Sequence, residues 1–133
     1  MRVTARETAF KVIFASNFTG EINRGTARAL YKSEKLTEDD IEYANKVLDT
    51  VEMHWNEYSA IIDKLSVSFP EVRIFPADKS IMMLALAEIY AFDDIPDVVS
   101  VNEAANIASK YSSEKSASFV SGILGEAIKE KNR

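Results

Sequence analysis

The fold is decided by the stretch from Ile81 to Leu124, which reads IMMLALAEIYAFDDIPDVVSVNEAANIASKYSSEKSASFVSGIL. Its first part is apolar on nearly every side of a helix and carries a single charge, Glu88. A turn sequence follows, then SVNEA, a serine-rich turn and a second apolar run. Because apolar residues recur at three- and four-residue spacings, the stretch predicts three consecutive helices.

The three helices have different predicted surroundings. The first, from about residue 77 to 92, is apolar all round, so we expect it at the centre of its half of the molecule. The second opens with a capping box at Ser100 and Glu103 and runs to Tyr111. The third runs from about 116 to 131. Its expected buried face consists of Phe119, Val120, Ile123, Leu124, Ala127 and Ile128.

The sequence before this stretch also predicts helices. A capping box at Thr4 and Glu7 opens a helix that Gly20 can end. Its expected buried face is Ala9, Phe10, Ile13, Phe14 and Phe18. After a short helix at about 23–33, Thr37 opens a long helix with an apolar seam in heptad spacing. The seam consists of Ile41, Ala44, Leu48, Val51, Trp55, Tyr58, Ile62 and Leu65. The same seam would occur in a free coiled coil. Because short helices lie on both sides of the long helix in the sequence, we favour a long helix that forms the spine of a helical bundle.

The predicted fold is all-α, with two small helical bundles that share the long helix. At 133 residues the chain has room for one domain, 1–133, with subdomains of about 1–66 and 67–133. There is no cysteine, which excludes disulfides and thiolate sites. The first residues lack the apolar core of a signal peptide, and no apolar run approaches the ~20 residues of a membrane span. We therefore expect a cytoplasmic protein without a membrane partner.

Charge is distributed unevenly along the chain, whose net charge is −5. Residues 1–35 carry seven Lys or Arg against three Asp or Glu, and residues 109–133 carry five against three. The middle, 36–108, carries four against fifteen. Basic ends suit phosphates and an acidic middle suits a basic protein. Ordinary solvated charge explains the counts equally well.

Motifs of enzymes are absent, including phosphate-binding glycine loops, zinc-protease motifs and serine-hydrolase elbows. The single histidine, His54, has no second ligand in sequence, and the acidic residues at 38–40 suit a helix N-terminus. Gly122 and Gly125 match a KH loop in letters only, and close helix packing explains them better. We predict no catalytic residue, no metal site and no cofactor.

Glu88 is the charged residue that most needs an explanation, since its neighbours are apolar. Leaving a buried carboxylate without its partner costs on the order of 3–5 kcal/mol. We therefore expect it to accept hydrogen bonds from backbone amides at the start of the next helix, near residues 99–101. This role is structural rather than catalytic.

Two basic segments are candidates for RNA binding. The candidate residues are Arg2, Arg6, Lys11, Lys110, Tyr111, Lys115 and Phe119. The first three lie at the start of the first helix or within it, where cations and the helix dipole can fix phosphates. The last four flank the serine-rich turn, where cations beside aromatic rings suit single-stranded RNA. Solvated lysines and a core tyrosine fit the same spacing.

These segments resemble the NusB family of transcription antitermination factors. The matching motifs are ARE at 5–7, DIP at 94–96, VNEA at 101–104 and FVSGIL at 119–124. The resemblance implies two perpendicular three-helix bundles and no catalysis. It also implies that the chain pairs with ribosomal protein S10 and that the pair binds boxA-type single-stranded RNA. The setting would be a transcription elongation complex on ribosomal RNA operons, where the pair favours antitermination.

The resemblance further implies where partners bind. RNA would contact the candidates named above, and the S10 surface would include Phe14 and Asp78. The chain departs from the family pattern at Met83, where an arginine is common, and at Ser121, which replaces the asparagine of FVNG. Its arginines before Lys11 are also sparse. A second hypothesis therefore stays open: a protein-interaction adaptor of the same fold that has lost most RNA binding.

Overall fold

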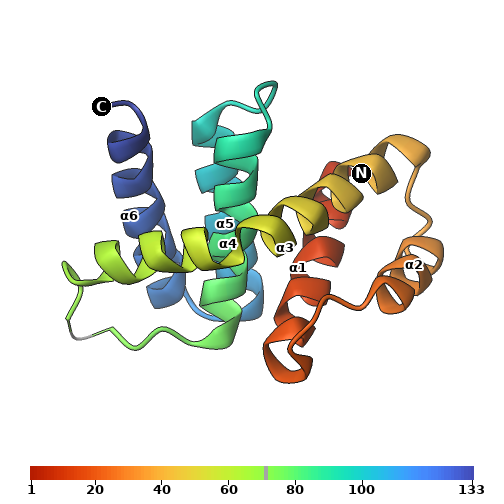
Figure 1. Ribbon diagram of the computed structural model, residues 1–133, viewed down its shortest axis with the longest axis horizontal. Helices are drawn as coiled ribbons and strands as arrows, with labels where there is room; N and C mark the ends of the chain where they lie inside the picture. Colours follow the sequence, from red (N-terminus) through yellow and green to blue (C-terminus); the bar gives the residue numbers. More distant parts are fainter. Residues whose placement is uncertain (71) are drawn as a thin grey trace.

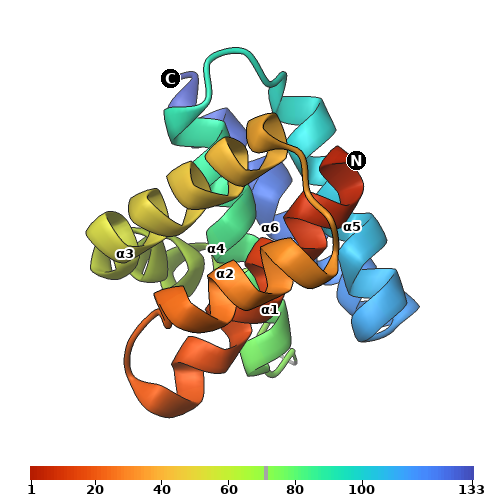
Figure 2. The same ribbon diagram turned by 90° about the vertical axis from the view of Figure 1, so that its right-hand side faces the viewer.

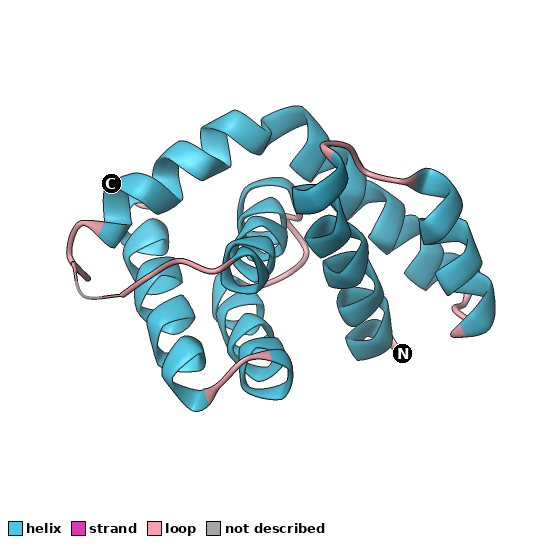
Figure 3. Cartoon of the chain, turned by 90° about the horizontal axis from the view of Figure 1, so that it is seen from below, coloured by secondary structure: helices cyan, strands magenta, loops and turns pink. Residues whose placement is uncertain are grey.

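The computed structural model describes residues 1–70 and 72–133, and these residues form helices and no strands (Figures 1 and 3). The helices are α1 (Arg2–Thr19), α2 (Arg24–Ser33), α3 (Glu38–Ser66), α4 (Pro76–Ala91), α5 (Asp97–Tyr111) and α6 (Glu114–Lys131). The all-α prediction is confirmed. Within the described residues, no helix is long and apolar enough to cross a membrane.

The long helix α3 joins the two halves of the molecule. Figure 1 shows it crossing from the side that holds α1 and α2 to the side that holds α4, α5 and α6. It packs against α1 on the first side and against α4 and α6 on the second. The short helix α2 packs on α1, where Figure 2 shows it in front. The shared long helix is thus as the sequence predicts.

Helix α4 lies at the centre of the molecule. It contacts α1, α3, α5 and α6, and every residue from Ser80 to Ile89 is buried. A helix surrounded on all sides needs an apolar residue at almost every position, which explains the sequence of this segment. The one charge in this run, Glu88, is fully enclosed.

Helix starts follow the sequence in some places and not in others. The side chains of Asn23, Thr37 and Ser113 cap α2, α3 and α6 by accepting hydrogen bonds from backbone amides. The two predicted capping boxes are wrong, because α1 already begins at Arg2 and α5 at Asp97. The residues before each predicted cap continue the helix, which leaves both capping side chains inside it.

Some predicted features of the packing need correction, beginning with Phe14 and Ile128, which are half-buried rather than buried. Phe18 is 69% exposed rather than buried, because it lies beyond the part of α1 that other helices cover. Ile41 and Trp55 are only half-buried, so the α3 seam does not face the core along its whole length. At His54 the backbone has φ −111° and ψ 19°, which kinks α3. The kink interrupts the regular seam immediately before Trp55.

Close packing is confirmed at Gly122, the glycine of the FVSGIL motif, but the same prediction is wrong for Gly125. A Cβ atom at Gly122 would lie 2.9 Å from the ring of Phe69. Nothing lies within 4 Å of the corresponding position at Gly125. Gly20 has φ +85°, a left-handed conformation that suits the end of α1.

Candidate nucleic-acid interface

Three of the predicted RNA-binding residues meet where the middle of α1 faces the end of α5. Lys110 Nζ lies 2.7 Å from Glu7 Oε1, an ion pair that joins the two helices. The rings of Phe10 and Tyr111 are 5.3 Å apart, and Lys11 Nζ lies 5.8 Å from the centre of the Tyr111 ring. The surface formed by Lys11, Lys110 and Tyr111 is called the basic–aromatic surface below. It combines residues that are about a hundred positions apart in the sequence.

The side chains of this surface reach solvent. Lys11 and Lys110 are exposed, and Tyr111 is 37% exposed while its ring rests on the buried Phe10. The ion pair with Glu7 raises the pKa of Lys110, so this residue keeps its positive charge at any physiological pH. Two cations beside a half-covered aromatic ring can hold a phosphate and stack a base.

Lys115 and Phe119 both lie near the start of α6 but differ in their exposure to solvent. Lys115 is exposed in the first turn after the cap at Ser113. Phe119 is 4% exposed and packs edge-on against Phe69, with ring centres 5.4 Å apart. Phe119 also lines a pocket at the start of α6. This pocket is lined by Val72, Arg73, Phe75, Asp78, Ser113, Lys115, Ser116 and Phe119.

Arg73 and Phe75 are residues of this pocket that the sequence reasoning missed. The Arg73 guanidinium lies 5.5 Å from the centre of the Phe75 ring, and Phe75 is 52% exposed. A cation over an exposed ring is the same combination that the sequence predicts around the serine-rich turn for RNA binding. The signal available in the sequence was an arginine two positions before a phenylalanine, immediately ahead of Pro76.

Arg6 lies inside the molecule rather than on its surface. Its Nε donates to Glu88 Oε2 at 2.8 Å and its Nη2 to Glu88 Oε1 at 3.3 Å. Only 5% of the residue is exposed, and a second carboxylate, Glu103, lies 3.8 Å from Nη1. Burial alone would lower the pKa of Arg6, but the hydrogen bond and charge of Glu88 outweigh it and raise the pKa. Arg6 therefore has little free surface for a phosphate.

The partners of Glu88 are side chains, which corrects the predicted backbone amides. Besides Arg6, the hydroxyl of Tyr43 donates to Oε2, and Ser100 Oγ donates to Oε1 at 2.9 Å. Ser100 lies inside α5, so its hydroxyl is free to turn toward α4 instead of capping a helix. Burial and the neighbouring charge of Glu88 raise the pKa of Tyr43, which stays neutral. This cluster links α1, α3, α4 and α5.

Arg2 is likewise engaged with carboxylates. Its Nε donates to Asp40 Oδ1 at 3.0 Å, and its Nη2 to Asp39 Oδ2 at 3.2 Å. Its guanidinium also lies 4.4 Å from the centre of the Tyr43 ring. Burial would raise the pKa of Asp40, but the hydrogen bond from Arg2 and the charge of the N-terminus hold it below its usual value. Arg2 ties α1 to the start of α3.

The two predicted S10-contact residues differ in accessibility. Phe14 is half-buried on α1, with its ring 6.1 Å from Phe10 and 5.3 Å from Phe18. Asp78 is 2% exposed, and its Oδ2 accepts a hydrogen bond from Ser116 Oγ at 3.1 Å. Burial raises its pKa, although the serine hydroxyl acts in the opposite direction. Both assignments stay predictions.

No cluster of three or more His, Asp or Glu side chains suited to a metal ion occurs among residues 1–70 and 72–133. At the start of α3, Asp39 and Asp40 interact with Arg2, and Asp40 Oδ2 also lies 3.2 Å from the N-terminal amino group. His54 forms a 2.8 Å contact with Glu57 on the same helix.

Comparison with protein families gives a match to the NusB family model over residues 3–129. Similar proteins include the transcription antitermination protein NusB of Finegoldia magna, 31% identical over 130 residues, covering 98% of this chain and 95% of that protein. The NusB of Natranaerobius thermophilus is 33% identical over 136 residues, covering 99% and 97%.

Solved structures of similar shape include the crystal structure of antitermination factors NusB and NusE in complex with dsRNA. That match has a TM-score of 0.84 and 27% sequence identity, covering 97% of this chain and 96% of the matched one. A crystal structure of T. maritima NusB matches with a TM-score of 0.85 and 25% identity, covering 98% and 92%.

Proposed function

We propose that this chain, which belongs to the NusB family, pairs with ribosomal protein S10 and binds boxA-type single-stranded RNA within a transcription elongation complex. In this role it favours antitermination on ribosomal RNA operons and acts without catalysis. The observation that carries the proposal is the basic–aromatic surface of Lys11, Lys110 and Tyr111 between α1 and α5.

The chemistry of this surface suits a single strand of RNA. Lys11 and Lys110 supply positive charge for phosphates, and the half-exposed ring of Tyr111 offers a face for a base. Lys115 extends the charge across the serine-rich turn. A similar solved chain was crystallised with NusE and dsRNA, which supports a nucleic-acid role for this fold.

The arginines of α1 have a positioning role in this proposal. Arg6 is held by Glu88 and Arg2 by Asp40, so neither has the freedom of an exposed lysine. Each fixes α1 against neighbouring helices and so sets where Lys11 lies. The RNA contacts in this chain therefore fall mainly on the lysines and on Tyr111.

The S10 side of the proposal rests on charge and on exposed aromatic area. The middle of the chain, 36–108, is strongly acidic, which suits a basic ribosomal protein. Phe14 and the 69% exposed Phe18 pack edge-to-face along α1 and offer apolar area for a protein partner. Asp78 is buried, so S10 would not contact its side chain directly. Its effect on S10 binding would come from the shape and charge that it gives to the neighbouring surface.

A second candidate function is a protein-interaction adaptor that binds RNA weakly. The observation that favours it is that Arg2, Arg6 and Lys110 are all paired with carboxylates. A phosphate at Lys110 would have to compete with Glu7. Under this hypothesis, S10 binds and RNA affinity stays negligible.

Fluorescence anisotropy with a labelled boxA RNA separates the two proposed functions. Binding is measured at several salt concentrations, with S10 present and absent. Under the leading proposal, Lys11→Ala and Lys115→Ala each weaken binding, and each flattens the logarithmic salt dependence by about 0.7. Lys64→Ala is the matched control, since Lys64 is an exposed lysine of α3 paired with Glu130. Negligible RNA affinity of the wild type with S10 present would favour the adaptor.

A further inference from the structure

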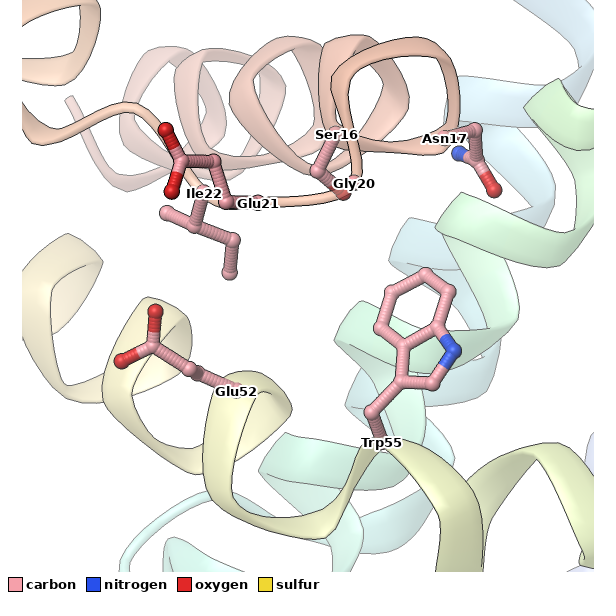
Figure 4. A pocket seen from close by; sticks show the side chains of 7 residues that line it. All are labelled: Ser16, Asn17, Gly20, Glu21, Ile22, Glu52 and Trp55. Atoms are coloured by element: carbon pink, nitrogen blue, oxygen red, sulfur yellow. The ribbon is translucent and has the colours of Figure 1, made fainter.

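A groove separates the end of α1 from the middle of α3. It is lined by Ser16, Asn17, Gly20, Glu21, Ile22, Glu52 and Trp55. Figure 4 shows Glu21 and Ile22 on one side of the open space and Glu52 and Trp55 on the other. The function proposed above does not use any of these residues.

The lining of the groove is acidic and aromatic. Glu21 and Glu52 are its only charged residues, and Glu21 forms no ion pair with any residue that the structure describes. Glu52 is held through Oε1 by Arg24 Nη2 at 3.2 Å, and the same nitrogen lies 2.9 Å from Asp49. One carboxylate is therefore free and the other only partly neutralised.

Trp55 already attracts a cation within this chain. Lys79 Nζ lies 5.5 Å from the centre of its ring, a cation–π distance, while the half-buried indole still lines the groove. The kink of α3 at His54 comes directly before this tryptophan. Irregular turns inside helices occur often at functional positions, and here the irregular turn adjoins the groove.

We propose that this groove receives an arginine or lysine side chain of the basic protein partner. The carboxylates of Glu21 and Glu52 would bind the charge, and the indole of Trp55 would cover the flat or methylene part of the side chain. Nucleic acid is disfavoured here because two carboxylates repel phosphates. The inference rests on the proposed pairing with S10 and adds a contact surface to it.

The chain contains a single tryptophan, so the groove can be observed directly. Protein labelled with 5-fluorotryptophan gives one ¹⁹F resonance, from Trp55, and unlabelled S10 is titrated into it. We expect the resonance to shift as S10 binds. In parallel, calorimetry measures S10 affinity for the double variant Glu21→Gln/Glu52→Gln. We expect about tenfold weaker binding and a flatter salt dependence, since a close charge pair is lost.

The matched control is Glu42→Gln/Asp63→Asn, which removes the same charge from exposed positions of α3 outside the groove. It should bind S10 nearly as the wild type does. If S10 binds but the Trp55 resonance stays in place, or if both double variants lose affinity equally, the groove is not a contact and the proposed function stands. If the wild type fails to bind S10 at all, the S10 pairing and the groove contact are both overturned.

Discussion

At the scale of the residue, Arg6 shows how one side chain can match a family motif and still act inside the fold. Its guanidinium forms two hydrogen bonds with Glu88, whose carboxylate also accepts from Tyr43 and Ser100. All four residues are at most 5% exposed. A buried pair of this kind contributes chiefly when it is complete, because losing one partner leaves the other charge unpaired.

Glu88→Gln should therefore lower the free energy of unfolding by about 3 kcal/mol, since Arg6 would lose its main counter-charge. Urea denaturation followed by circular dichroism measures the change. Glu103→Gln is the control, because Glu103 is only half-buried and lies 3.8 Å from Arg6. Its effect should stay below about 1 kcal/mol. An unchanged urea midpoint for Glu88→Gln would refute the structural role of this cluster.

Asp78 predicts a pH dependence of stability. Burial raises its pKa above the ordinary 3.8, so the folded protein binds a proton more tightly than the unfolded chain does. Stability from this residue is therefore present below pH 3.8 and is lost as the pH rises through the raised pKa. Asp78→Asn should be more stable than the wild type at pH 7, with the difference shrinking toward pH 3.

Asp40 should give the opposite dependence of stability on pH in the same experiment. Its pKa is lowered by Arg2 and by the N-terminal amino group, so its contribution is present at neutral pH and lost on acidification. Asp40→Asn should therefore be less stable than the wild type at pH 7. Thermal unfolding from pH 3 to 7 measures both variants. Parallel curves for the wild type and Asp78→Asn across this range would contradict the prediction.

At the scale of the element, helix starts depend on more than a capping sequence. Thr37 caps α3 as its sequence predicts, whereas Thr4 and Ser100 lie inside α1 and α5. A capping box satisfies free amides only where the helix begins, and an earlier start leaves none for it to satisfy. The side chain of Ser100 instead contributes to a tertiary hydrogen bond.

The two glycines of α6 give a matched pair of substitutions. Gly125→Ala should raise the free energy of unfolding by about 1 kcal/mol, because alanine favours the helix and no side chain or neighbouring helix lies within 4 Å of the new methyl group. At Gly122 the methyl carbon would lie 2.9 Å from Phe69, whose ring is packed on Phe119. Gly122→Ala should lose this gain and become less stable than the wild type.

Thermal denaturation measures the difference in stability between the two variants. We expect this difference because Gly122, unlike Gly125, lies close to the ring of Phe69. If both alanines stabilise α6 equally, the ring of Phe69 yields freely and the packing of this motif is looser than its geometry indicates.

At the scale of the whole molecule, α3 and the Arg6–Glu88 pair connect the two predicted subdomains. α3 packs on α1 and on α4 and α6, and the buried pair joins α1 to α4. The division at about residue 66 is therefore bridged by apolar packing and by a charge pair. Neither half can unfold without exposing part of the other.

The chain should therefore unfold in a single cooperative transition, as small domains usually do. Trp55 lies in the groove between α1 and α3 and also contacts Lys79 of α4, so its fluorescence reports on the junction of the two subdomains. Far-ultraviolet circular dichroism reports on all the helices. The two signals should give the same midpoint in urea and on heating. Two separated transitions would show that the subdomains are independent folding units.

The sequence by itself determined the helices and most, but not all, of their burial pattern. The spacing of apolar residues gave the six helical segments, and the apolar surface of residues 81–89 placed α4 at the centre. Both follow from local rules, since helical period and hydrophobicity are properties of neighbouring residues. The same segment, through its VNEA and FVSGIL motifs, also pointed to the family.

Only the tertiary structure decided which charged residues face solvent and which turn inward. Lys11, Lys110 and Tyr111 form one surface because α1 and α5 approach each other, whereas the neighbouring Arg6 turns inward to Glu88. Sequence spacing shows that a cation lies near the edge of a helix face, but its partner is set by another helix many residues away. Whether such a side chain binds a ligand or stabilises the fold depends on that distant carboxylate.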